Sequence, residues 1–147
     1  MSLTLWRDNH WIIDVERSAE HVADLLALAE REIGDAALSG ISADGRFNHA
    51  YEAIRALCEA ALLASGFATA KGSRQHERAI ESLKFTIDGE WTTAVDFLDR
   101  CRRIRNQTID ERAGVVQAAD ADRLLDHARR LATALADWLG REHADRV

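Results

Sequence analysis

Apolar residues recur at helical spacing along most of the chain, in stretches that short polar or glycine-containing segments separate. A repeat of about 3.6 residues is typical of amphipathic helices that bury one face. The pattern predicts helices over five stretches, residues 18–38, 47–65, 73–87, 91–112 and 120–140. No stretch shows the convincing alternation that would indicate a strand. We therefore predict an all-α fold, an up-and-down four-helix bundle with an additional fifth helix.

Residues suited to helix ends support these boundaries. Ser18 and Asp120 can each act as an N-cap, because a side-chain oxygen there can accept a hydrogen bond from a free backbone N–H group. Gly66 follows the second predicted helix in the manner of a glycine C-cap. The segment 39–45, which contains two glycines and two serines, is predicted to be a turn.

Residues 1–17 form an N-terminal arm that lacks helical periodicity but is rich in apolar residues, including Trp6 and Trp11. An exposed arm of this composition would be sticky, so it must cover the bundle or bury itself in a second protomer. We assign residues 1–17 as this arm and residues 18–147 as a single helical domain.

The stretch from Trp91 to Arg112 contains the strongest functional signal. On a helix, Arg102 and Arg105 fall on the same line as the apolar Trp91. A fully buried, unpaired arginine is strongly disfavoured, so this face must open into a cleft, a partner or a bound anion. In the alternative interpretation, carboxylates at the mouth of the bundle satisfy the arginines.

Composition limits the class of protein. The 147-residue chain is 47% hydrophobic and 30% charged, without proline, as expected for one globular domain. It lacks the basic and apolar segments of a signal peptide and any apolar run long enough to cross a bilayer, so we predict no membrane association. Cys58 and Cys101 are predicted to be buried thiols of a cytoplasmic protein, with a disulfide as the alternative.

Net charge of −6 argues against indiscriminate nucleic-acid binding, which depends on neutralised phosphates. Residues 99–112 nevertheless contain five arginines and three acids, a local charge of +2. A small basic patch on an acidic body suits local recognition of a phosphate or an acidic partner.

The familiar catalytic motifs are missing. No glycine-rich phosphate loop or serine nucleophile elbow is present. None of the six histidines follows a carboxylate by three residues, and neither cysteine has a partner at zinc-finger spacing. We therefore predict no metal site and no cofactor.

Three segments together resemble the HEPN (higher eukaryotes and prokaryotes nucleotide-binding) domain family. Residues 50–66 look like the second HEPN helix, and Ser73-Arg-Gln-His76 opens the next helix in a familiar way. The most specific match is Arg105-Asn106 near the end of the fourth helix. The family signature is an arginine, often followed by a polar residue, and a histidine about four to six residues later.

The resemblance implies a HEPN-like homodimer whose signature segments meet across a cleft. Active members cleave RNA without metal through the arginine and histidine, often as bacterial toxins of toxin–antitoxin pairs. Here the histidine position is occupied by Asp110. An aspartate, with an ordinary pKa near ~3.9, is ionised at neutral pH and is a poor general acid.

Three hypotheses follow. In the favoured one, a non-catalytic HEPN-like dimer binds RNA, a nucleotide or a cognate protein partner through Arg102, Arg105 and Asn106. In the second, a divergent metal-independent ribonuclease uses Arg105 to stabilise the phosphate, with Asp110 or a histidine outside the motif as proton carrier. In the third, the bundle is purely structural, and the arginines form salt bridges, for example to Glu52 or Glu59.

Overall fold

The computed structural model describes residues 2–87, 91–110 and 116–142, with the backbone alone for residues 107–110 and 142. The fold is mostly helical, with about 75% helix, as the apolar pattern predicts. Its elements in chain order are α1 (Leu3–Asp8), β1 (Ile12–Asp14), α2 (Ala19–Ala36), α3 (Ala43–Ala64), β2 (Phe67–Thr69), α4 (Gln75–Glu81), the 3-10 helix η1 (Ser82–Lys84), α5 (Trp91–Asp110) and α6 (Ala118–Glu142).

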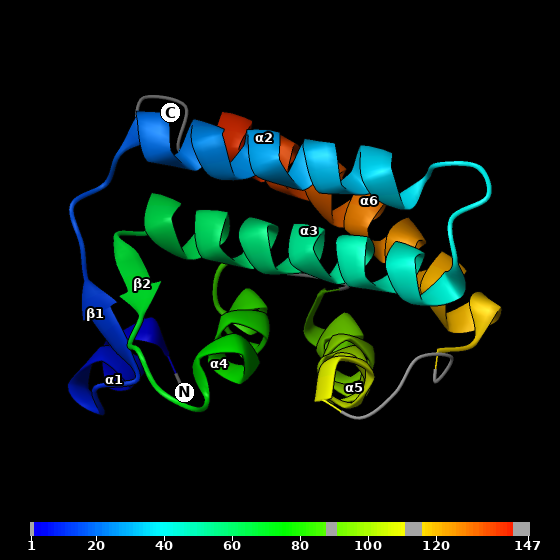
Figure 1. The fold of residues 1–147 in the computed structure, drawn as a ribbon. Helices are drawn as coiled ribbons and strands as arrows, with labels where there is room; N and C mark the ends of the chain where they lie inside the picture. The colour runs from blue at the N-terminus through cyan, green and yellow to red at the C-terminus, as the bar shows by residue number, and fades with distance from the viewer. Residues whose placement is uncertain (1, 88–90, 111–115, 143–147) are drawn as a thin grey trace.

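Helix α3 forms the centre of the fold (Figure 1). Helices α2 and α6 pack on one side of it, and α4 and α5 lie on the other. Helices α2 and α3 lie across the view, whereas α5 is seen nearly along its axis, so α5 crosses under α3. The all-α class is therefore confirmed, while the helices around α3 are not all parallel.

The composition of α3 explains its central place. More than half of its residues are buried, and many of these are alanines. Alanine has the highest helix propensity, and its small side chain lets neighbouring helices approach closely. Larger side chains from the flanking helices fill the remaining core, among them Trp91, Leu98, Leu124, Leu131 and Leu135.

Two predicted boundaries are wrong for local reasons. Helix α3 begins at Ala43, inside the predicted turn, because the Ser42 hydroxyl accepts a hydrogen bond from the Gly45 N–H group at 3.0 Å and caps the helix. The third predicted helix is split into α4 and η1. There the Ser82 hydroxyl donates to the Ala79 carbonyl at 2.6 Å, a local bond that competes with the α-helical pattern.

Two other helix ends, at Ser18 and Gly66, agree with the sequence. The Ser18 hydroxyl accepts a hydrogen bond from the backbone of His21 at the start of α2. Gly66 has φ +92°, the left-handed conformation that glycine adopts readily after a helix. The predicted Asp120 cap is wrong, because α6 begins at Ala118 and Asp120 lies inside its first turn.

The N-terminal arm has more structure than its sequence indicates. It contains α1 and β1, and β1 pairs antiparallel with β2, with Ile12 opposite Thr69. Trp6 is 3% exposed and contacts Phe85 edge-on, so this side chain packs on its own chain. The expectation of no strand is corrected, because a three-residue pair is too short to leave an alternating pattern.

The predicted burial of both cysteines is confirmed. Cys58 and Cys101 are both buried free thiols. Burial raises the pKa of each thiol, to about 12 for Cys101, so neither is a reactive thiolate at neutral pH.

Within the described ranges, no helix combines the length and the apolar character that a membrane crossing requires.

Candidate functional site between α3, α4 and α5

Helix α5 passes from a buried to a half-buried face along one line, as predicted. Trp91, Val95 and Leu98 are buried in the core. Further along the same line, the side chains of Arg102 and Arg105 are 18% and 19% exposed. Both arginines have carboxylate partners, so the helix avoids an unpaired buried charge.

Arg105 binds α3. Its terminal Nη2 donates to the Glu52 carboxylate at 2.6 Å, and its guanidinium lies 5.1 Å from the centre of the Tyr51 ring. Glu52 also accepts from Arg55 at 2.8 Å, and Arg55 donates to Glu59 at 2.9 Å. We call Glu52, Arg55, Glu59 and Arg105 the ion-pair cluster. Two guanidinium groups and two carboxylates balance its charge.

In and next to the ion-pair cluster, two polar atoms are buried without a hydrogen bond to the described part of the chain. They are the Tyr51 hydroxyl and the Nε of Arg105. Burial raises the pKa of Tyr51 above its ordinary value, although Arg105 opposes the shift, so the phenol stays neutral. Because Arg105 on α5 contacts both Glu52 and Tyr51 on α3, its side chain links the two helices.

The second arginine lines a pocket. Arg102 and Asn106, one turn apart on α5, face the start of α4 across a pocket of about 180 Å³. Arg102 donates its Nε to Asp99 at 2.9 Å, which leaves its two terminal nitrogens without a hydrogen bond to the described residues. We call this the Arg102 pocket, and its lining residues are Gly72, Ser73, Gln75, His76, Glu77, Arg102 and Asn106.

The Arg102 pocket contains charges of both signs, and its acidic residue is paired with an arginine outside the pocket lining. Its acid, Glu77, accepts a hydrogen bond from Arg74 at 3.1 Å. Burial lowers the pKa of His76, and the nearby Arg55 and Arg105 lower it further. His76 is therefore neutral at pH 7, and a neutral imidazole can accept a proton.

The predicted site residues are thus only partly brought together. Arg102 and Asn106 share the Arg102 pocket, while Arg105 binds Glu52 behind it. The side chain of Asp110 lies outside the described residues, so its predicted role as proton carrier stays a prediction.

Sequence reasoning missed His76 as a pocket residue. His76 enters the sequence analysis only as part of the segment that opens a helix, and its ring lies 6.3 Å from that of Tyr51. Its place in the first turn of a helix could have predicted a pocket residue, because a side chain there can face both the core and a loop.

A second basic pocket of about 270 Å³ lies between α5 and α6. Arg123 and His127 line it, and the Arg123 guanidinium stacks 4.0 Å above the Phe97 ring. Burial lowers the pKa of His127, although its Nδ1 lies 2.9 Å from the Arg123 carbonyl.

No protein-family model, no curated protein and no solved structure matches the chain.

Proposed function

We propose that the protein is a non-catalytic helical module that binds RNA by taking a backbone phosphate into the Arg102 pocket. The observation that carries this proposal is the pairing of Arg102 and Asn106 around one pocket, in which the terminal nitrogens of Arg102 donate no hydrogen bond to a described residue. A guanidinium group offers two parallel N–H donors that fit a phosphate.

Pocket size favours a phosphate of a longer ligand over a whole nucleotide. Sites that enclose a small molecule usually occupy about 300–1,000 Å³. The Arg102 pocket, at about 180 Å³, is smaller. A single phosphate group fits this scale, and further phosphates of an RNA strand can contact exposed arginines such as Arg103.

The HEPN resemblance supports the same proposal and extends it to a homodimer in the cytoplasm. Membership of a toxin–antitoxin or defence system, with a cognate protein as partner, is a prediction that rests on this resemblance alone.

The test is binding of a fluorescein-labelled single-stranded RNA in EDTA, followed by fluorescence anisotropy. Arg102→Ala should weaken binding by about tenfold or more, because a hydrogen bond to a charged group contributes about 1.5–3 kcal/mol. The matched control is Arg103→Ala, which removes the same charge from a side chain that is 64% exposed and also near Asp99. Its effect should be smaller, and higher salt should weaken the wild type.

Three results would overturn the proposal. Absence of RNA binding by the wild type favours the purely structural bundle, in which Arg105 serves the ion-pair cluster. Equal losses for Arg102→Ala and Arg103→Ala indicate diffuse attraction without a pocket. If Arg123→Ala causes the larger loss, the binding site is the second basic pocket.

A divergent ribonuclease is the second candidate, because His76 lines the same pocket as Arg102. A neutral histidine beside a bound phosphate can accept the proton of a ribose hydroxyl. The same RNA is analysed for cleavage in EDTA. Cleavage that disappears in both Arg102→Ala and His76→Gln would replace the binding proposal with this one, whereas intact RNA excludes it.

A further inference from the structure

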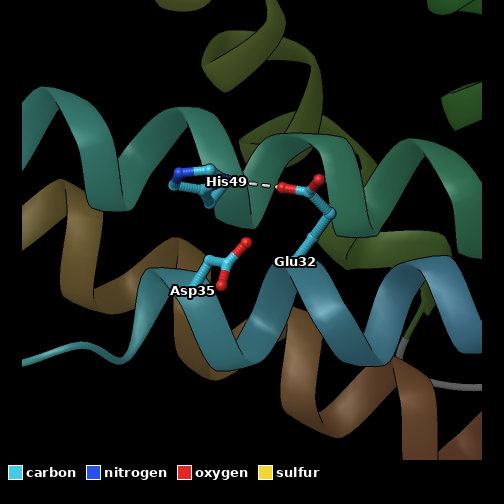
Figure 2. A group of neighbouring side chains, drawn as sticks. All are labelled: Glu32, Asp35 and His49. Atoms are coloured by element: carbon cyan, nitrogen blue, oxygen red, sulfur yellow. Dashed lines mark hydrogen bonds and ion pairs between the residues drawn. The ribbon is translucent and has the colours of Figure 1, made fainter.

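Two carboxylates and an imidazole converge between α2 and α3 (Figure 2). None of the three residues lines the Arg102 pocket. Glu32 and Asp35 lie one turn apart on α2, and His49 faces them from α3. One ligand atom from each of the three side chains lies within 4.8 Å of the other two. We call these residues the carboxylate–histidine cluster.

We propose that the carboxylate–histidine cluster binds a divalent transition-metal ion of the zinc class. Zinc takes imidazole nitrogen and carboxylate oxygen ligands at about 2.0–2.2 Å. The ligand atoms lie within 4.8 Å of one another, and even at that limit the centre of the triangle is about 2.8 Å from each corner. Movements of about 0.7 Å per ligand atom therefore reach bonding distance.

The charge of the cluster favours a cation. Glu32 accepts a short hydrogen bond from the Nδ1 atom of His49 at 2.6 Å, and its other oxygen lies 3.8 Å from Arg31, which is 69% exposed. Asp35 has no ion pair within the described ranges of the chain. Two carboxylates therefore face one imidazole, and a metal that replaces the shared proton would neutralise the remaining charge.

The two helices are held in the register that the site needs. Arg46, one turn before His49, donates its Nε to the carbonyl of Ala36 at 2.9 Å. This bond ties α3 to the end of α2, next to Asp35. The Glu32 side chain is 14% exposed and that of His49 is 40% exposed, so water can reach one side and complete the coordination.

The donor set selects among metals. Calcium and magnesium prefer oxygen ligands, whereas an imidazole suits zinc and its transition-metal neighbours. The expectation of no metal site came from ligand spacing along single helices, and these ligands come from two helices.

The test is isothermal titration of tag-free, EDTA-stripped and dialysed protein with zinc chloride. One ion should bind per chain, and Asp35→Asn and His49→Gln should each weaken binding at least about tenfold. Asp24→Asn is the matched control, because it removes an exposed carboxylate from the same helix, and it should bind zinc like the wild type. Zinc should also raise the melting temperature of the wild type more than that of Asp35→Asn.

Asp35→Asn keeps the Glu32–His49 hydrogen bond, so its metal-free fold should match the wild type by circular dichroism. The proposal is overturned if the wild type binds no zinc at about 1 mM. It is also overturned if both ligand variants bind like the wild type, or if magnesium or calcium binds more tightly than zinc.

Discussion

Helix α3 takes part in two polar clusters that lie only one turn apart along it. At Glu52 and beyond, the ion-pair cluster joins α3 to α5, and each carboxylate there meets a guanidinium group. At His49, the carboxylate–histidine cluster joins α3 to α2, and two carboxylates meet one imidazole. Both clusters are half-buried, so their burial does not distinguish them.

Charge balance separates the two clusters. In the ion-pair cluster, every charge has a partner from the chain itself, and the arrangement holds α5 against α3 without a ligand. In the carboxylate–histidine cluster, the described chain places only an imidazole and the 69% exposed Arg31 beside two carboxylates, which favours a cation from solution. A cluster of charged residues therefore indicates a binding site when its charges do not balance, and indicates a structural link when they do.

The largest effect should come from breaking the ion-pair cluster. Glu52→Ala removes the carboxylate shared by Arg55 and Arg105, and should lower the free energy of unfolding by about 1.5–3 kcal/mol, measured by urea denaturation. Glu59→Ala is the control within the cluster, because Glu59 has Arg55 as its partner and Arg105 keeps Glu52. Glu59→Ala should therefore lower the free energy of unfolding by less than Glu52→Ala does.

A double-mutant cycle isolates the bond between helices. Glu52→Ala and Arg105→Ala should together cost less than the sum of the single losses, since each removes the same 2.6 Å contact. Additive losses would mean that the contact contributes nothing, and the structural interpretation of Arg105 would be wrong.

A smaller effect should appear in the pH dependence of stability. Burial lowers the pKa of His76 in the folded protein, and Arg55 and Arg105 add to the shift. The unfolded chain therefore binds a proton first, near its ordinary pKa of about 6.5, and stability falls as the pH drops below about 7. His76→Gln should reduce the difference between the urea midpoints at about pH 7.5 and pH 5.5. If His76→Gln leaves the difference between the two urea midpoints unchanged, His76 is not the source of the pH dependence.

The sequence predicts the helices well because core packing repeats along each of them. The line from Trp91 to Leu98, the buried cysteines and the Gly66 helix end all follow from local spacing. The strand pair at Ile12 escapes prediction because its partner is more than fifty residues away. The break at Ser82 escapes because one hydroxyl bond decides it.

The candidate sites are harder to predict because they join separate helices. The line of Arg102 and Arg105 on α5 is visible in the sequence, but the choice of Glu52 as partner for Arg105 depends on how α5 crosses α3. The meeting of Asp35 and His49 depends in the same way on the register between α2 and α3. Spacing within one helix contains no information about either contact.

The smallest predicted effect concerns the cation beside the carboxylate–histidine cluster. Arg31 lies 3.8 Å from Glu32 but is 69% exposed, so water and salt screen its attraction. Arg31→Ala should therefore leave stability nearly unchanged, yet it should tighten zinc binding about 1.4- to fivefold, since an exposed pair contributes about 0.2–1 kcal/mol. Titration at low and high salt provides the check, because the gain should shrink as salt rises. Weaker zinc binding in Arg31→Ala would mean that Arg31 orients Glu32 rather than competing for it, and the charge argument would then fail at this position.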